Sequence, residues 1–412
     1  MKRVVITGIG AITPYGQNED FFENMVAGHS AVTSLTAFPE KSHSYCSIAG
    51  QVHDFKPENF FPLKTANRMD RFIQMAAAAS ITARQDAALP DVFDDPNRVG
   101  VSVGSSAGGF ATIEDNFYRM LERGPNRCSP FTVPMLIVNM ASGWISILQG
   151  AKGYSSCPST ACATGASAIG DAMRTIQLGL ADVMFAGGSE APITPLCMAA
   201  FASSRVLSAR NSDPAKASRP FDSERDGFVM SEGACILVIE ELEHALKRKA
   251  RIYAELKGFG CVSDAYDFVS PREDGDGAKR AMSGAISQSG WSLDEVDYVN
   301  AHATSTLVGD RSEASAISTL FKTCKEKVLV SATKSMTGHM LGSAGAIEAA
   351  ICCLSITRKI VPPTINLVNV DSLCELNHAL KAVKKNVVRA LSNSFGFGGH
   401  NTSLAFEAFS TV

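Results

Sequence analysis

The sequence predicts an α/β protein built from two similar halves. Short β-branched runs that end at glycine alternate with Ala-rich segments whose apolar residues recur at helical spacing. Two segments of the first half return in weaker form in the second half. With 412 residues, 45% of them hydrophobic and 19% charged, the chain is long and apolar enough for two halves that share one core.

The expected strands are short apolar runs, and the expected helices carry apolar residues at i, i+3 and i+4. The strands are Arg3–Thr7, Arg98–Val103, Asp182–Ala186, Ala234–Glu240, Tyr298–Asn300 and Val328–Ser331. The helices are Arg68–Ala83, Ser167–Leu178, Gly277–Ser287 and Ala344–Arg358. The segment Ser208–Gly227 is expected to be a long ordered loop, because a strand follows it at once.

The internal similarity sets the expected domain organisation. Residues 5–10, with Gly8 and Gly10, resemble residues 255–260, and residues 165–172 resemble residues 342–349. We therefore predict an N-terminal half of residues 1–250 and a C-terminal half of residues 251–412.

Charge and cysteine content narrow the class of partner and the compartment. Lys plus Arg (38) against Asp plus Glu (41) leaves a net charge of -3, which argues against a nucleic-acid-binding protein. Eleven cysteines, with Cys352 and Cys353 adjacent, favour reduced thiols and hence a cytoplasmic or equivalent reducing location. No run approaches the ~18 apolar residues of a membrane span, so we expect no membrane insertion.

Three motif matches are better explained by structure than by catalysis. Gly8-Ile9-Gly10 resembles a dinucleotide fingerprint, but Thr13 stands where the third glycine belongs. Residues 104–108 match the G-x-S-x-G elbow, so a serine hydrolase that uses Ser106 is an alternative hypothesis, and it predicts that Cys162→Ala stays active. Ser331-x-x-Lys334 lacks the companion motifs of serine acyl enzymes.

Cys162 is the strongest candidate nucleophile. It lies among small residues immediately before a predicted helix, which leaves room for a substrate. A helix N-terminus favours thiolate over thiol, so we expect a lowered pKa for Cys162. A buried structural cysteine is the alternative explanation, and it suits the other ten cysteines better.

Two histidines lie in hydroxyl-rich loops that follow strands, the place where α/β proteins put their chemistry. They are His302, in Asn300–Thr306, and His339, at the end of Thr333–His339. A metal site is not expected, because no close Cys or His spacing supports one. The glycine-rich segment Asn393–Asn401 suits a backbone that approaches a ligand closely and moves.

Taken together, these segments resemble the β-ketoacyl-[acyl-carrier-protein] synthases, in particular the elongating enzymes of type II fatty acid synthesis. The resemblance runs over essentially the whole chain and implies a thiolase fold, a duplicated five-layered αβαβα core, in a homodimer. The segments that carry it are 4–10, Ala161-Cys162, 187–190, 219–222, 225–228, 300–302, 333–339, 362–366 and 393–399.

The resemblance also implies an acyltransferase mechanism with no cofactor, since the phosphopantetheine arm arrives on acyl carrier protein. Cys162 would take the acyl group, with the oxyanion held by the N–H groups of Cys162 and Phe397. Malonyl-carrier protein would then lose carbon dioxide and condense, assisted by His302 and His339. Lys334 and Glu348 would be a supporting ion pair.

Other residues resemble binding positions of the family. Thr304 and Thr306 match hydroxyls that hold the phosphopantetheine arm, Phe397 matches a gating residue, and Ala107 and Phe201 match residues lining an apolar acyl pocket. Carrier protein is acidic, so a basic rim is expected around the tunnel mouth. The candidate docking residues are Lys64, Arg68, Arg127, Arg205 and Arg210.

Several positions depart from the family pattern and bear on the substrate. A bulky aliphatic residue is common where Ala107 stands, and Ser167, Ala303, Leu307-Val308 and His400 also differ. A specialised polyketide or aryl-polyene synthase therefore stays open. A non-condensing partner subunit is a further alternative, against which the presence of Cys162 and both histidines argues; a protein that mainly decarboxylates malonyl thioesters is another.

Overall fold

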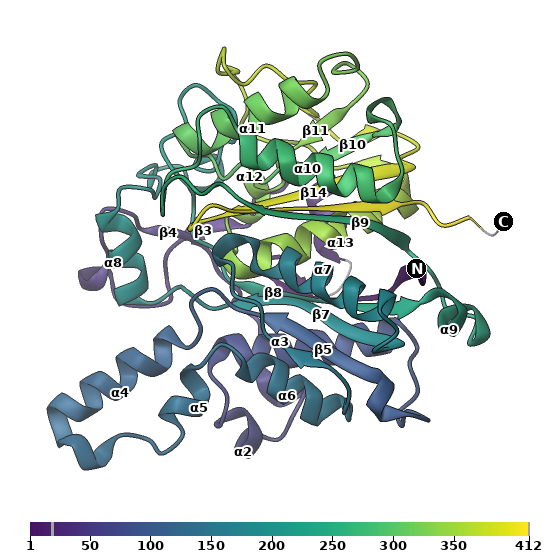
Figure 1. Ribbon diagram of the computed structural model, residues 1–412. Helices are drawn as coiled ribbons and strands as arrows, with labels where there is room; N and C mark the ends of the chain where they lie inside the picture. Colours follow the sequence, from purple (N-terminus) through teal and green to yellow (C-terminus); the bar gives the residue numbers. More distant parts are fainter. Residues whose placement is uncertain (18–19, 411–412) are drawn as a thin grey trace.

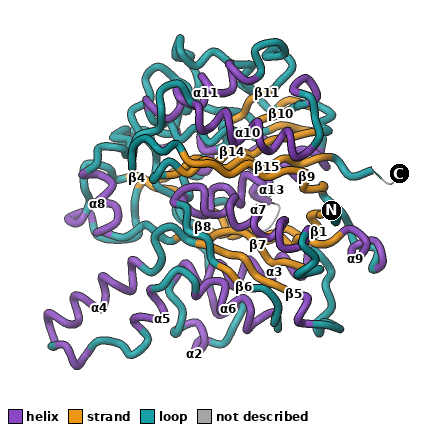
Figure 2. The backbone as a smooth tube through the Cα atoms, in the orientation of Figure 1, coloured by secondary structure: helices purple, strands orange, loops and turns teal. Residues whose placement is uncertain are grey.

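The computed structural model describes residues 1–17 and 20–410 and shows five layers. Two central helices lie between two groups of strands, and further helices cover the outer faces of both groups (Figure 1). Coloured by secondary structure, the two strand groups are separated by α7 and α13 (Figure 2). The αβαβα architecture expected from the resemblance is confirmed.

The layers are made of these elements. The outer helices on the N-terminal side are α3 (Arg71–Asp86) and α6 (Met140–Gln149). The first strand group is β1 (Val4–Thr13), β5 (Val99–Gly104), β6 (Ser155–Ser156), β7 (Val183–Glu190) and β8 (Gly233–Glu241). The central helices are α7 (Thr164–Gln177) and α13 (Ala344–Arg358). The second strand group is β9 (Ala254–Ser263), β10 (Tyr298–Asn300), β11 (Leu329–Ser331), β14 (Arg389–Gly396) and β15 (His400–Glu407), covered by α10 (Asp276–Ser289) and α11 (Leu307–Leu320).

The strand order shows the duplication directly. The first group runs β6-β5-β7-β8-β1 and the second β11-β10-β14-β15-β9. In each group the first two pairings are parallel and the last two antiparallel. The groups join where Val5 and Ile6 of β1 pair with Glu255 and Ala254 of β9. The same topology therefore occurs twice in the chain.

Close helix packing explains the repeated glycines. A Cβ at Gly165 would lie 2.8 Å from the backbone N of Ala346, and a Cβ at Gly345 would lie 2.8 Å from the backbone N of Ala166. The two central helices thus cross through equivalent glycines. Likewise, a Cβ at Gly10 would lie 2.0 Å from the carbonyl oxygen of Ala79 on α3. The Gly-x-Gly after the start of β1 serves helix packing, as the structural interpretation predicted.

The remaining elements connect or extend this core. The strands are β2 (Gly16–Gln17), β3 (Val32–Ser34), β4 (Ile48–Gly50), β12 (Ile360–Val361) and β13 (Val383–Lys384). The helices are α1 (Asp20–Val26), α2 (Leu63–Ala66), α4 (Phe110–Arg123), α5 (Thr132–Leu136), α8 (Pro195–Ser203), α9 (Leu242–Lys247) and α12 (Lys334–Thr337). Helix α4 projects away from the five layers (Figure 1).

One described stretch has the length and composition of a membrane-spanning helix. It is Leu341–Arg358, which contains α13, and 89% of it is buried inside the protein. Burial between the two strand groups explains its apolar composition.

Candidate active site

Cys162 lies in a short turn at the entrance to central helix α7. The turn is the 3₁₀ segment Ala161–Ala163, and Ala161 adopts a left-handed φ of 50°. The Thr164 hydroxyl closes the turn by accepting from the N–H of Thr160 (2.9 Å) and donating to the carbonyl of Ala161 (2.7 Å). Cys162 is half-buried, and these hydrogen bonds hold the turn that carries its thiol.

The imidazole of His339 lies directly beside the thiol. Its Nε2 is 3.0 Å from Sγ of Cys162. The backbone of His339 is tied to the segment after the long loop: its N–H donates to Val229 O (2.7 Å), and its carbonyl accepts from Ser231 N (3.0 Å). The ring packs edge-on against Phe228 at 5.2 Å between centroids. The structure therefore fixes which ring nitrogen faces the sulfur.

His302 completes a three-residue cluster from the loop after β10. Its ring centroid lies 5.5 Å from that of His339 and 5.7 Å from that of Phe395. A buried carboxylate holds the loop, because Glu313 accepts from the N–H of His302 (3.0 Å) and of Ala303 (2.7 Å). Glu313 also accepts from the Asn393 amide at 3.0 Å. Sequence reasoning assigned no role to Glu313, since no motif marks this carboxylate.

Lys334 and Glu348 form a buried ion pair next to the histidines, each side chain being 1% exposed. Burial, followed by the charge of Lys334, holds the pKa of His302 and of His339 well below 6.5. Burial also raises the pKa of Glu348 to about 7, against the attraction of Lys334. Both histidines are thus neutral near pH 7, and each has one N–H to donate.

The predicted lowering of the Cys162 pKa is wrong. Burial raises the pKa of this thiol to about 12, although Lys334 and the N–H groups of Cys162 and Phe397 act in the opposite direction. Desolvation of the thiolate outweighs the helix end. The resting nucleophile is therefore a thiol, and neutral Nε2 of His339 is placed to accept its proton.

Ser106 has a structural partner. Its hydroxyl and its N–H (2.9 Å) both donate to Glu190, a buried carboxylate at the end of β7. Glu190 also accepts from the Ser105 hydroxyl (2.6 Å), from the Ala107 N–H (3.0 Å) and, from the other half, from the Gly342 N–H (2.9 Å). Glu190 thus accepts five hydrogen bonds that tie the two halves together. It stands where the G-x-S-x-G elbow of a hydrolase requires a histidine, so the structure gives Ser106 a structural role and does not support the hydrolase hypothesis. Sequence reasoning noted Glu190 within a shared segment but gave it no role.

The predicted substrate-binding residues lie on several segments around this cluster. Thr304 and Thr306 follow His302, and their hydroxyl oxygens are 3.2 Å apart. Phe397 is 39% exposed at the turn between β14 and β15. Phe201 on α8 packs edge-on against Phe228 at 5.8 Å between ring centroids, and Phe228 in turn packs against His339. Ala107 lies in the loop after β5 that Glu190 fixes. Their substrate roles stay predictions.

The predicted docking residues differ in their exposure and in whether an acidic side chain of the same chain pairs with them. Lys64, Arg68, Arg127 and Arg205 are exposed, and the Arg68 guanidinium lies over the Phe131 ring at 5.3 Å. Arg210, in contrast, pairs with Glu224 (3.6 Å) and Asp226 (3.9 Å). Its charge is therefore largely balanced within the chain.

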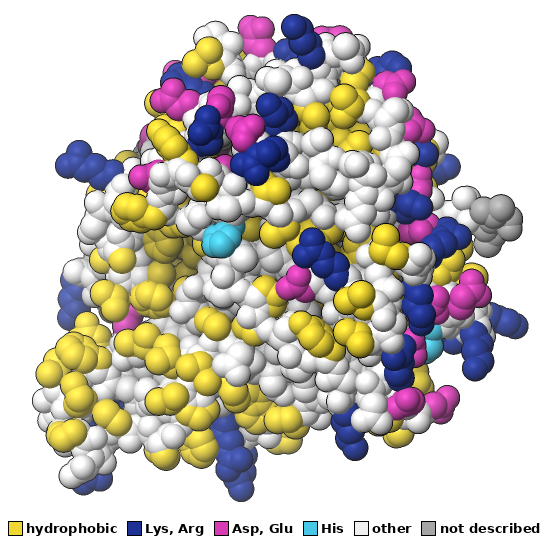
Figure 3. Space-filling view, in the orientation of Figure 1, with side chains coloured by type: hydrophobic (Ala, Val, Ile, Leu, Met, Phe, Trp, Pro, Cys, Tyr) yellow, Lys and Arg dark blue, Asp and Glu magenta, His cyan; other side chains and the backbone are white. Residues whose placement is uncertain are grey.

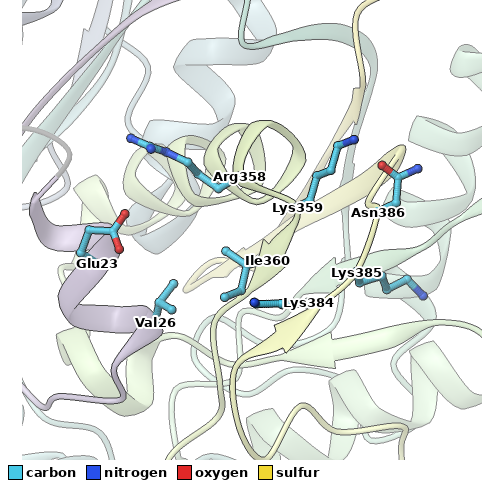
Figure 4. Close-up of a pocket in the computed structure, with 8 residues that line it drawn as sticks. All are labelled: Glu23, Val26, Arg358, Lys359, Ile360, Lys384, Lys385 and Asn386. Carbon is cyan, nitrogen blue, oxygen red and sulfur yellow. The ribbon is translucent and has the colours of Figure 1, made fainter.

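Metal ligands and a cavity elsewhere in the described residues are two further features to set against the thiol cluster. No group of three or more His, Cys, Asp or Glu is placed to hold a metal within residues 1–17 and 20–410. A cavity of about 540 Å³ lies elsewhere, at the end of α13 (Figure 4), and no cysteine, serine or histidine lines it. Its lining residues are Glu23, Val26, Arg358, Lys359, Ile360, Lys384, Lys385 and Asn386.

The site is a cysteine beside two neutral imidazoles, and it lies between two copies of one α/β unit. This combination defines a thiolase-fold enzyme that works through an acyl-cysteine. The comparisons make this specific. The family model "Beta-ketoacyl synthase, N-terminal domain" matches residues 1–245, and "Beta-ketoacyl synthase, C-terminal domain" matches residues 253–368. The chain belongs to the beta-ketoacyl synthase family.

Similar proteins cover the whole chain. A 3-oxoacyl-[acyl-carrier-protein] synthase 2 from Synechocystis sp. is 48% identical over 410 residues, which is 99% of this chain and 98% of the relative. A beta-ketoacyl synthase structure from Burkholderia phymatum is 34% identical, covers 100% of both chains and has a TM-score of 0.92. A type II polyketide ketosynthase solved with its acyl-carrier protein is 33% identical, covers 99% of this chain and 100% of its own, and has a TM-score of 0.91.

Proposed function

We propose that this protein is an elongating β-ketoacyl-[acyl-carrier-protein] synthase. It condenses a Cys162-bound acyl chain with malonyl-acyl carrier protein to give 3-oxoacyl-acyl carrier protein and carbon dioxide. The observation that carries the proposal is the 3.0 Å approach of His339 Nε2 to the Cys162 sulfur, with His302 beside it. The 48% identity to a synthase of this kind over 99% of the chain supports it.

In the first half-reaction Cys162 takes the acyl group. The thiol gives its proton to Nε2 of His339, and the sulfur attacks the carbonyl carbon of the acyl thioester. The N–H groups of Cys162 and Phe397, which point at the sulfur, stabilise the tetrahedral oxyanion beside it. The carbon–sulfur bond to phosphopantetheine then breaks, and the departing thiolate takes the proton.

In the second half-reaction the malonyl thioester occupies the same arm site. His302 and His339 each donate an N–H to the thioester oxygen while carbon dioxide leaves and an enolate forms. The enolate carbon attacks the Cys162 thioester, and Cys162 leaves as a thiolate that takes up one proton from solvent, which replaces the proton lost in the first half-reaction. Nδ1 of both histidines lacks a partner in the described structure, so neither tautomer is locked and His339 can serve as acceptor and donor in turn.

The carrier protein reaches the site across a basic surface. The exposed cations Lys64, Arg68, Arg127 and Arg205 suit an acidic partner. Thr304 and Thr306 hold the phosphopantetheine arm, so the enzyme needs no cofactor of its own. The related ketosynthase solved with its carrier protein supports this partner. Eleven free cysteines favour a reducing, cytoplasmic location.

The protein acts as a homodimer. Helix α4 has an apolar outer face and a polar inner one: Phe117 and Leu121 are 53% and 65% exposed, while Glu114 and Asn116 are buried. This apolar face and neighbouring α5 form a continuous patch at the lower left of the space-filling view (Figure 3). An exposed apolar patch of this kind marks a protein–protein interface, and a second copy of the chain would bury it.

The alternatives have less support. A non-condensing partner subunit has no use for the assembled cluster of Cys162, His302 and His339. A specialised polyketide synthase is favoured by the 33% identical ketosynthase. The 48% identity to a 3-oxoacyl-[acyl-carrier-protein] synthase 2 favours fatty acid elongation more strongly.

Mass spectrometry of the intact protein tests the proposal. The wild type, Cys162→Ala and Ser106→Ala are incubated with acyl-acyl carrier protein, and malonyl-acyl carrier protein is then added. We expect an acyl-sized mass gain on the wild type and Ser106→Ala, discharged as 3-oxoacyl-carrier protein, and none on Cys162→Ala. A protein that shows neither an acyl adduct nor malonyl decarboxylation would contradict the assignment.

A further inference from the structure

We propose that Arg225 is the positioning residue that holds Thr304 and Thr306 in register for the phosphopantetheine arm. This proposal deepens the proposed function and rests on it. It assigns a role to the segment 219–228, for which the family resemblance implies no function. The segment lies between two site features, since it touches the threonine loop and ends at Phe228, which packs against His339.

The guanidinium of Arg225 donates hydrogen bonds to the backbone next to the threonines. The side chain is fully buried; Nε donates to the carbonyl of Thr306 (3.0 Å) and Nη2 to that of Leu307 (2.8 Å). Nη1 donates to Asp371 Oδ2 at 3.0 Å, and Asp310 lies 3.4 Å from Nε. Only a planar fork of donors reaches two successive carbonyls and two carboxylates at once. The carboxylates offset its buried charge, and the carbonyls receive its directional contacts.

The loop that Arg225 holds has an unfavourable backbone conformation. Ser305 has a left-handed φ of 74°, which costs a non-glycine residue free energy unless its surroundings impose it. Those surroundings are present: Ser305 N donates to Asp310 (3.1 Å), its carbonyl accepts from Gly227 N (3.1 Å), and its hydroxyl accepts from Arg219 N (3.0 Å). Every polar group of Ser305 is thus anchored by the same network.

The consequence is a fixed pair of hydroxyls beside the thiol cluster. With Ser305 turned and Thr306 O held, the hydroxyl oxygens of Thr304 and Thr306 stand 3.2 Å apart. Two adjacent hydroxyls both donate and accept, as the amide groups of a pantetheine arm require. Releasing Arg225 leaves Cys162 untouched but loosens the arm site. The enzyme therefore loses its preference for arm-bearing thioesters rather than its nucleophile.

The test compares two small acyl donors that carry no carrier protein. The first is an acyl-pantetheine, and the second is the ethyl thioester of the same acyl group, which has no amide or hydroxyl to meet the threonines. For Arg225→Lys we expect the rate constant of Cys162 acylation by acyl-pantetheine to fall about tenfold, the loss of one or two hydrogen bonds. The rate with the ethyl thioester is expected to stay within about twofold.

Arg311→Lys is the matched control. Arg311 donates to the same Asp371 carboxylate at 2.8 Å, but its side chain is 41% exposed and no described contact joins it to residues 304–306. We expect both rate constants to be unchanged in this variant. Thr304→Val combined with Thr306→Val should reproduce the Arg225→Lys pattern, and adding Arg225→Lys to this pair should cost little more.

The outcomes distinguish a failure of the proposed function from a failure of the positioning role of Arg225. A wild type that is acylated neither by these donors nor by acyl-acyl carrier protein contradicts the proposed function itself. An acylated wild type together with an equal loss for both donors in Arg225→Lys overturns the positioning role, because it shows general damage to the site. Should Arg225→Lys not fold, Ser305→Gly removes the hydroxyl anchor without disturbing a buried charge. It must show the same selective loss, and an equal loss overturns the proposal.

Discussion

Lys334→Met tests the electrostatics of the site in a way that can be worked out from the structure. The Lys334 ammonium is buried against Glu348, and its charge lowers the pKa of both histidines. Methionine keeps most of the volume and removes the charge. The buried Glu348 carboxyl then has no ammonium to favour its ionised form.

The expected magnitude follows from the Glu348 pKa of about 7, raised from 4.5 by burial. The folded protein holds this proton more tightly than the unfolded chain, so the contribution of Glu348 to stability falls as pH rises from 4.5 to about 7 and is level above that. In Lys334→Met the folded-state pKa rises further, and the fall continues above pH 7. At about 1.4 kcal/mol per pH unit, the variant loses at most roughly 3 kcal/mol relative to the wild type between pH 7 and 9.

Urea unfolding of the two proteins from pH 7 to 9 measures this difference. The double variant Lys334→Met/Glu348→Gln is the control, because it has no titrating carboxyl; its difference from the wild type should not change over this range. The histidines give a second readout. Their pKa values rise without Lys334, so the acid limb of the condensation-rate profile should move to higher pH. Parallel stability profiles for wild type and Lys334→Met would refute the reasoning.

Three further predictions address packing, assembly and docking. Gly345→Ala should lower the free energy of unfolding by about 1–3 kcal/mol, because its Cβ would lie 2.8 Å from Ala166 N. Gly143→Ala should leave it unchanged, because its Cβ would lie 3.9 Å from Met140 Sδ, an ordinary contact; urea titration measures both. Leu121→Glu should give a monomer in sedimentation, while Val92→Glu, at a more exposed position off the α4 face (81% against 65%), should stay dimeric; two dimers would contradict the proposed interface. The double variant Lys64→Glu/Arg68→Glu should raise the KM for acyl-carrier protein several-fold and leave the KM for acyl-pantetheine unchanged. An equal rise in both KM values would exclude a docking role.

The sequence predicts the layered core well because that core depends on local patterns. All six expected strands and all four expected helices exist, with ends that match or shift by up to six residues, the largest shift being the end of β1 at Thr13 instead of Thr7. Core elements absent from the sequence prediction include β9, β14, β15, α6 and α11. Helix α4 is absent too, although Ile113, Phe117 and Leu121 recur at helical spacing. Spacing indicates a helix but not what its apolar face packs against. In α4 that face points away from the chain's own core.

The site shows the same limit in its chemistry. Small residues around Cys162 indicate a nucleophile, but the direction of its pKa shift depends on how much of the surrounding structure desolvates it. Helix position alone gave the wrong sign. Glu190 was given no role for a related reason. Its partners Ser105 and Gly342 lie 85 and 152 residues away in sequence, so no local pattern reveals the cluster.

The duplicated topology explains how these distant groups come to meet. In each half a short 3₁₀ turn precedes the central helix: Ala161–Ala163 before α7 and Leu341–Ser343 before α13. A strand glycine of the other half packs on each turn. Gly396 of β14 lies against Cys162, and Gly188 of β7 lies against Gly342. Because the helices cross through equivalent glycines, both turns face the same space. Duplication thus supplies one shared site with two unlike walls, which allows the first half to keep the nucleophile and the second half to carry both histidines.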